Sequence, residues 1–217
     1  ELATYGDLFH FQRNKSIHPD KKLRPPEAAK FWRGIANGTF QIFSSDHAPY
    51  RFDHTGKLAA GPNPTFPQVA NGVPGIELRL PLLFSEGVGK GRIDIHQFVA
   101  LTATNVAKIY GLHPRKGTIA VGSDADIAIW DPDKELTVTW DLLHDNVGYT
   151  PYEGQTIKGW PVIVLSRGNV VVEEGELKMD RGSGQFVSRS LSQAAQPLGR
   201  LVPEMDPARN FGADMLP

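Results

Sequence analysis

The chain has 217 residues, enough for one large domain or two smaller ones with a buried core. Lysine and arginine total 23 and aspartate and glutamate total 24, so the net charge of −1 gives no general reason to bind nucleic acid or an anionic membrane. The lack of cysteine excludes disulfides and thiolate-bound zinc. With no run of about 18 apolar residues and no N-terminal signal pattern, the sequence predicts a cytoplasmic protein whose partner is a small molecule.

The first predicted element is a helix that opens at the proline pair 25–26 and ends near Gly38. One apolar stripe runs along it with i, i+3, i+4, i+7 spacing, formed by Ala28, Phe31, Trp32 and Ile35. A short apolar strand, residues 41–46, follows. This order of helix and strand is typical of one repeat of an α/β barrel.

Residues 47–75 are rich in proline and glycine, which predicts a long loop leaving the C-terminal end of that strand. A second helix is expected over 77–86, before a glycine-rich break at 87–91. A third helix begins near Asp94 as N-cap and ends at Gly111. Its expected apolar face comprises Ile95, Phe98, Val99, Thr102, Val106, Ile109 and Tyr110.

Beyond residue 117 the pattern changes to short β-branched runs bounded by Asp, Pro and Gly. Strands are predicted over 126–130, 136–140 and 162–165, followed by a hairpin whose turn lies at 174–175. The residues from 181 onward have weak periodicity and are expected to wrap over a neighbour as an extended tail.

Three polar residues near the first strand and its loop are candidates for chemistry. Asp46 ends the strand, where barrel enzymes place functional groups, although an Asp before a proline-containing turn often only accepts backbone N–H groups. Asn71 precedes Gly72, so it either contributes to a site or forms a simple turn. His47 either orients a neighbouring carboxylate or carbonyl, or is structural.

Several runs together resemble the cyclic amidohydrolases, specifically the dihydropyrimidinase and D-hydantoinase group, from about Phe31 to Gly212. These runs are Ser45-Asp46-His47-Ala48-Pro49, Gly61-Pro62-Asn63-Pro64, Asn71-Gly72-Val73-Pro74-Gly75 and the stretch from Gly117 to Asp126. The resemblance implies an α/β fold: the C-terminal part of a (β/α)8 barrel over 1–112, part of a small β-sandwich over 113–180, and a tail over 181–217.

The resemblance also implies a metal-dependent hydrolase that opens hydantoins or dihydropyrimidines to N-carbamoyl amino acids. In that pattern Asp46 is both a metal ligand and the carrier of a proton to the ring nitrogen. Main-chain groups of Asn71 hold the imide edge of the substrate. Two zinc ions are implied per complete site, and their other ligands, including a carboxylated lysine, are expected upstream of this chain.

It follows as an expectation that the chain is one part of an enzyme, inactive without a missing N-terminal half or a companion chain, and that the complete protein is a homo-oligomer, a tetramer or a dimer. The serine that contacts substrate in the family has no counterpart here, so Ser16 is not assigned that contact and residues 1–24 have no assigned role. Five- and six-membered substrates both remain open.

Two alternatives stay beside this interpretation. One is an allantoinase-type amidohydrolase, and the other is a non-catalytic homologue that serves as a scaffold. Asp46 favours catalysis, because a silent homologue has no chemical reason to keep a carboxylate at that strand end.

Overall fold

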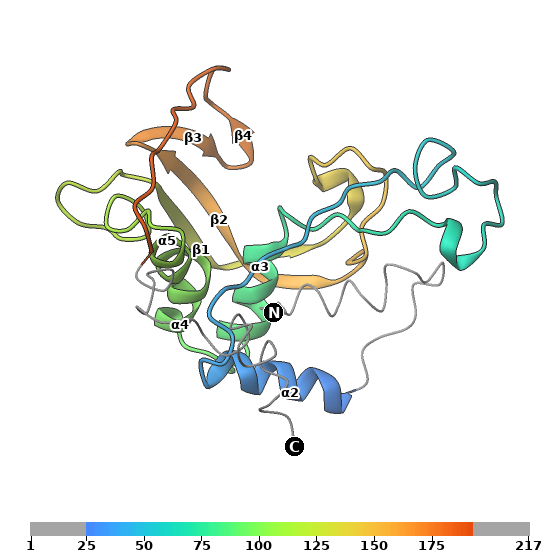
Figure 1. The fold of residues 1–217 in the computed structure, drawn as a ribbon, viewed down its shortest axis with the longest axis horizontal. Coiled ribbons are helices and arrows are strands. Elements are labelled where there is room, and N and C mark those ends of the chain that lie inside the picture. The colour runs from blue at the N-terminus through green and yellow to red at the C-terminus, as the bar shows by residue number, and fades with distance from the viewer. Residues whose placement is uncertain (1–24, 193–217) are drawn as a thin grey trace, which may run out of the picture.

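A computed structural model of the chain describes residues 25–192. Residues 1–24 and 193–217, which hold the start of the first predicted domain and most of the predicted tail, lie outside the described residues. The strands form one four-stranded sheet. Figure 1 shows this sheet beside a group of short helices, with a long loop that extends away from both. The division into segments 1–112, 113–180 and 181–217 stays a prediction.

The first predicted helix is confirmed as α2 (Pro25–Ala36). Trp32 and Ile35 are buried, and the ring of Phe31 stacks on Phe40 at 5.6 Å between ring centroids. Gly38 follows the helix with φ 78°, a left-handed conformation that glycine adopts without steric cost. The chain thereby turns back so that residues 40–46 run past the helix.

The second predicted helix is observed with shifted bounds and a wider turn. Helix α3 (Arg79–Leu83) continues directly into a π-helical segment, η2 (Phe84–Val88). Gly87 lies inside this segment, so the predicted break begins too early. A Cβ on Gly87 would lie 3.0 Å from the Ile93 side chain, and the glycine therefore serves the packing of the helix rather than its end.

The third predicted helix consists of α4 (Ile95–Val99), a π-helical segment η3 (Ala100–Thr104) and α5 (Asn105–Ile109). Asp94 is its N-cap, as predicted, and accepts a hydrogen bond from the Gln97 backbone N–H at 2.7 Å. The predicted apolar face is only partly right, because the π turn changes the helical period. Phe98, Leu101 and Ala107 are buried, whereas Ile95, Val99 and Tyr110 are exposed.

The predicted strand over 41–46 is wrong for this structure. The segment carries no strand assignment, and the nearest strand-like contact is a single parallel bridge between His47 and Val73. A strand requires a neighbouring backbone to form a ladder. Here Phe43 N–H bonds instead to the Leu101 carbonyl at 3.1 Å, and the Gln41 carbonyl accepts from the Asn105 side chain at 3.0 Å.

The predicted β region forms one antiparallel sheet in the order β1-β2-β3-β4. Its strands are β1 (Ile127–Thr137), β2 (Thr156–Ser166), β3 (Asn169–Glu173) and β4 (Glu176–Leu177). The two strands predicted over 126–130 and 136–140 are one strand, with an irregular register between Asp131 and Glu135. Pro132 lies in this irregular stretch and has no N–H to donate.

The hairpin predicted around 174–175 is confirmed. Glu173 pairs with Glu176, and the two turn residues Glu174 and Gly175 both have positive φ, 47° and 83°. Such a pair of left-handed residues matches the right-handed twist of two antiparallel strands. No second sheet exists among residues 25–192, so the sandwich stays a prediction.

Apolar packing joins the helices to the sheet. Phe84 of η2 packs against Phe98 of α4 and stacks on Trp130 of β1, with ring centroids 5.5 and 5.0 Å away. Gly159 of β2 makes this approach possible, because a Cβ there would lie 2.2 Å from the Phe84 ring. A second buried cluster, formed by Leu78, Val138 and Ile157 with Leu82 of α3 packed against it, also joins the helices to the sheet.

An ion-pair network fastens the segment between α5 and β1. Lys116 Nζ contacts Asp124 at 2.9 Å and also bonds Asp126, while Arg115 Nε lies 3.0 Å from Asp124. Hydrogen bonds from Lys116 and Arg115 lower the pKa of Asp124. Burial raises the pKa of Asp126, but bonds from Lys116 and the Arg167 N–H outweigh this and lower it overall. The same bonds raise the pKa of Lys116.

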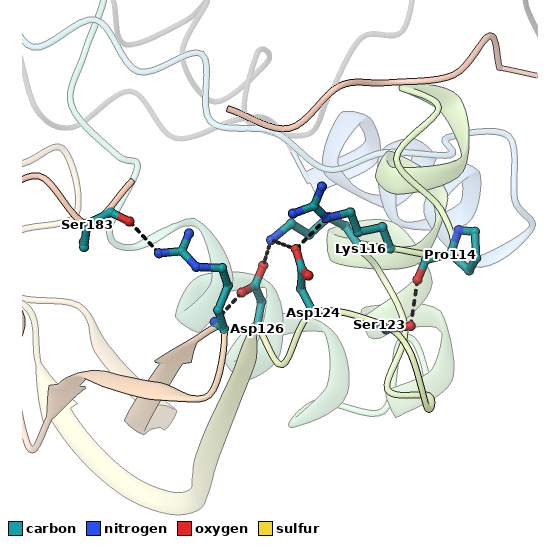
Figure 2. Close-up of polar contacts among 8 residues, drawn as sticks. Pro114, Lys116, Ser123, Asp124, Asp126 and Ser183 are labelled. Carbon is teal, nitrogen blue, oxygen red and sulfur yellow. Dashed lines mark hydrogen bonds and ion pairs between the residues drawn. The ribbon is translucent and has the colours of Figure 1, made fainter. Parts of the chain in front are cut away.

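Figure 2 shows how this network reaches neighbouring segments. Ser123 donates a hydrogen bond to the Pro114 carbonyl at 2.8 Å, and the Arg167 guanidinium donates one to the Ser183 carbonyl at 2.5 Å. The run from Gly117 to Asp126 therefore has a structural role, because its side chains hold the connection between α5 and β1. None of the helices described over residues 25–192 is long and apolar enough to span a membrane.

Candidate active site

Asp46 lies at the end of a segment that is anchored in the core. Phe43, three residues earlier, is buried between the helices, whereas Asp46 itself is exposed. The backbone of Asp46 has φ 44°, in the left-handed region that few non-glycine residues occupy. Such a conformation costs free energy and persists where the surroundings fix it, often at functional sites. The chain therefore turns sharply at the residue that the sequence singles out.

Arg79 also fixes this segment, through a hydrogen bond to its backbone. Its Nη1 donates a hydrogen bond to the Phe43 carbonyl at 2.6 Å, and burial lowers the pKa of its guanidinium. This bond replaces one that a neighbouring strand would otherwise provide. Arg79 is not among the residues predicted from the sequence, although a single cation within the apolar run 78–83 is a signal that could have identified it.

His47 connects the end of the segment to the far end of the loop. Its Nδ1 accepts hydrogen bonds from the backbone N–H groups of Gly75 at 3.1 Å and Ile76 at 3.3 Å. An accepting Nδ1 carries no proton, so the proton of the neutral ring lies on Nε2. Of the roles considered for His47, the structure supports the structural one, with backbone N–H groups as partners.

Asn71 lies where the loop returns to the segment that carries Asp46. The next residue, Gly72, has φ 122°, and a Cβ on it would lie 2.3 Å from the Ala48 Cβ. One residue further, the Val73 carbonyl accepts from the Ala48 N–H at 3.0 Å. Gly72 thus allows a contact between two backbones that no larger residue would permit. Asp46 and Asn71 belong to two chain segments that run side by side.

Lys57 is a further residue that the sequence did not reveal. Its side chain lies inside the loop, and its Nζ donates hydrogen bonds to the carbonyls of Ala70 at 2.8 Å and Gly72 at 2.5 Å. Burial lowers the pKa of this ammonium. Its partners lie 13 and 15 residues further along the chain, so no local sequence pattern marks it.

The described residues do not form a metal centre by themselves. Over residues 25–192, no group of three or more His, Asp or Glu side chains lies close enough to hold an ion. Asp46 is an exposed carboxylate and fits the role of one ligand, because carboxylates bind Zn²⁺ and other divalent cations. The predicted pair of zinc ions would need most of its ligands from elsewhere.

The sequence model of the amidohydrolase family matches residues 11–171. This chain therefore belongs to the amidohydrolase family, and the resemblance found in the sequence is confirmed. It is 44% identical over 170 residues to a D-hydantoinase of Ralstonia pickettii, an alignment that covers 76% of this chain and 36% of the relative. It is 41% identical over 169 residues to a dihydropyrimidinase of Rattus norvegicus, covering 77% of this chain and 32% of the relative.

The fold agrees with this assignment. The crystal structure of a dihydropyrimidinase from Brevibacillus agri NCHU1002 superimposes with a TM-score of 0.75 and 41% sequence identity, over 86% of this chain and 40% of that structure. This chain thus spans about a third of the length of the curated relatives it matches.

Proposed function

We propose that this chain forms the C-terminal part of a hydrolase that opens cyclic amides, hydantoins or dihydropyrimidines, to N-carbamoyl amino acids. The observation that carries the proposal is the arrangement around Asp46. An exposed carboxylate stands at a left-handed turn, and a chain segment with Asn71 and Gly72 is fixed beside it. The relatives named D-hydantoinase and dihydropyrimidinase support this choice of substrate class.

Ring opening adds water across one amide bond. The water oxygen bonds to the carbonyl carbon, the C–N bond breaks, and one proton of the water moves to the leaving nitrogen. Asp46 is proposed to carry this proton, because a carboxylate can accept it during attack and release it to the nitrogen afterwards. Asn71 is proposed to hold the imide edge through its main-chain groups, which would fix the ring relative to Asp46.

A divalent metal pair, two zinc ions in our proposal, would supply the activated water when bound. The described residues offer Asp46 as a single ligand to it. In this proposal, residues of this chain transfer the proton and bind the ring. The remaining metal ligands come from a part of the protein outside residues 25–192. The intact protein is therefore proposed to need that part before it is active. The family resemblance alone is the basis for proposing that it is a homo-oligomer, a tetramer or a dimer.

The test uses the intact protein that carries this chain. Hydantoin and dihydrouracil are supplied, and the N-carbamoyl product is quantified together with zinc content. Asp46→Asn, which keeps the shape but not the charge, is expected to lower kcat by about 10²- to 10⁴-fold, the usual range for a lost general acid–base group. Asp180→Asn, at an exposed position beyond β4, is the matched control and should retain wild-type kcat.

Two results would contradict the proposal. Wild-type protein that binds the ring but yields no product in the presence of zinc would favour the non-catalytic scaffold. Equal activity of wild type and Asp46→Asn would remove Asp46 from the reaction.

A further inference from the structure

Lys57 is buried in a loop whose other large side chains are largely exposed. Its relative exposure is 4%, whereas Tyr50, Phe52 and Phe66 of the same loop are 45%, 46% and 53% exposed. Removing an ammonium from water is costly unless hydrogen bonds replace the lost hydration. The burial of this one cation therefore calls for a reason in the structure around it.

The partners of Lys57 are main-chain carbonyls on both sides of Asn71. Nζ donates to the carbonyls of Ala70 at 2.8 Å and Gly72 at 2.5 Å. Bonds from a charged donor are about twice as strong as those between neutral groups. Two such bonds from one atom fix the peptide that precedes Asn71 and the peptide that follows Gly72.

Because the peptide group is planar, the contact between Lys57 and the Ala70 carbonyl also fixes the direction of the Asn71 N–H. The Ala70–Asn71 peptide is trans, since the cis bond found in the described chain is His113–Pro114. In a trans peptide the C=O and the N–H point to opposite sides. With the Ala70 carbonyl directed at Lys57, the Asn71 N–H points away from the ammonium. The same bond polarises the peptide and makes this N–H a stronger donor.

Lys57 is itself held in place. Its backbone N–H donates to the Arg51 carbonyl at 2.8 Å, which closes a turn within the loop. Gly56, inside this turn, cannot be replaced without displacement, because a Cβ there would lie 2.2 Å from the Arg51 carbonyl oxygen. The turn therefore fixes the backbone of Lys57, and the hydrogen bonds to Ala70 and Gly72 fix its ammonium.

We infer that Lys57 is a positioning residue for substrate: it clamps the carbonyls of Ala70 and Gly72 so that the Asn71 N–H is directed at a carbonyl oxygen of the cyclic amide. The inference deepens the proposed function and rests on it for the identity of the ligand. Lys57 itself touches neither the ring nor the reacting atoms. It acts through the orientation and polarity of one peptide group.

Lys57→Met is the principal test, because methionine fills a similar volume without charge or N–H donors. In the intact protein we expect KM for hydantoin to rise about ten-fold, the scale of one well-made hydrogen bond, with kcat changed by less than that. Amide hydrogen exchange of Ala48, Gly75 and Ile76 should accelerate, since these N–H groups bond across the same contact. Lys57→Arg, which keeps charge and donors, should restore part of both effects.

Lys108→Met, at an exposed position of α5, is the matched control and should change neither KM nor exchange. A purely structural role for Lys57 would reduce the amount of active protein, lowering apparent kcat while KM stays constant. If Lys57→Met does not fold, Lys57→Gln retains an N–H donor without charge, and its KM should lie between that of wild type and about ten times that value.

Unchanged KM together with unchanged exchange in Lys57→Met would overturn the inference. The failure of the proposed function has a different signature. In that case wild-type protein releases no N-carbamoyl product, while the exchange of Ala48, Gly75 and Ile76 still reports whether Lys57 holds the Asn71 segment.

Discussion

The sheet region and the segment around Asp46 satisfy their backbone groups in different ways. In strands β1 to β4 the N–H and C=O groups pair with one another along ladders. Around Asp46 few backbone groups pair with one another, and side chains supply several of the remaining bonds. Arg79 bonds the Phe43 carbonyl, His47 accepts two N–H groups, and Lys57 bonds two carbonyls. A ladder tolerates many side chains, whereas a backbone held by side chains depends on each of them.

This difference predicts the largest effects on turnover at the side chains that hold the site. Arg79→Met leaves the Phe43 carbonyl without its donor and should cost about 1–3 kcal/mol in the free energy of unfolding. Because a displacement of about 1 Å at a reacting group can cost about 10²-fold in rate, kcat should fall by that order even in the folded fraction. The measurements are urea denaturation and hydantoin turnover of the intact protein.

Arg33→Met is the control for this substitution, since Arg33 is exposed on α2. Both kcat and stability of this variant should stay near wild type. If the two arginine variants behaved alike, Arg79 would not hold the segment that carries Asp46.

A substitution in the sheet region should affect stability and leave the chemistry intact. Gly159→Ala brings a Cβ within 2.2 Å of the Phe84 ring at a residue with φ 96°. Overpacking and backbone strain together should cost about 2–4 kcal/mol, measured as a lower urea midpoint. Turnover per folded molecule should stay unchanged.

Gly154→Ala separates the two contributions. Gly154 has φ 75°, and a Cβ added to it would meet no atom within 4 Å, so only the conformational cost of about 1 kcal/mol applies. Equal losses in Gly154→Ala and Gly159→Ala would show that contact with Phe84 does not limit the packing of β2.

Substitutions in the ion-pair network of Lys116, Asp124 and Asp126 should give the smallest effect, because its groups are partly exposed and screened by water. The pKa values of Asp124 and Asp126 are lowered, so the stability they contribute is present above their ordinary value of 3.8 and is lost as pH falls through the lowered values. The pKa of Lys116 is raised, so its contribution is present below 10.5 and is lost as pH rises through the raised value.

Lys116→Met should therefore weaken the acid dependence of the melting temperature. Between about pH 7 and about pH 3, wild-type protein should lose more Tm than this variant, while Lys108→Met should follow the wild type. The same loss of Tm in all three proteins would mean that the ion-pair network contributes no measurable stability.

Local signals in the sequence predicted the structure correctly where it is decided locally. The proline pair at the start of α2, the Asp94 cap and the turn at 174–175 each act within a few residues, and each is found as predicted. The strand predicted over 41–46 is wrong because an apolar run becomes a strand only beside a partner backbone. The π turn at 100–104 was missed because no residue pattern in it departs from an ordinary helix.

The candidate site shows the same limit. Asp46 was selected for its position at the end of an apolar run, whereas its role and that of Asn71 came from a family resemblance, and both roles stay proposals. Lys57 was invisible to sequence reasoning, because a lysine in a polar loop is normally solvated and its carbonyl partners lie far along the chain. Only the folded loop shows that this cation is buried.

A crystal structure of the intact protein with a slowly hydrolysed cyclic imide bound would test the central claim most directly. We predict that an Asp46 carboxylate oxygen lies within about 2.6–3.2 Å of the leaving nitrogen or of one water that bridges to it. We also predict that the Asn71 N–H donates to a carbonyl oxygen of the ring. A ring bound away from both residues, with Asp46 facing only solvent, would contradict the proposed roles of Asp46 and Asn71.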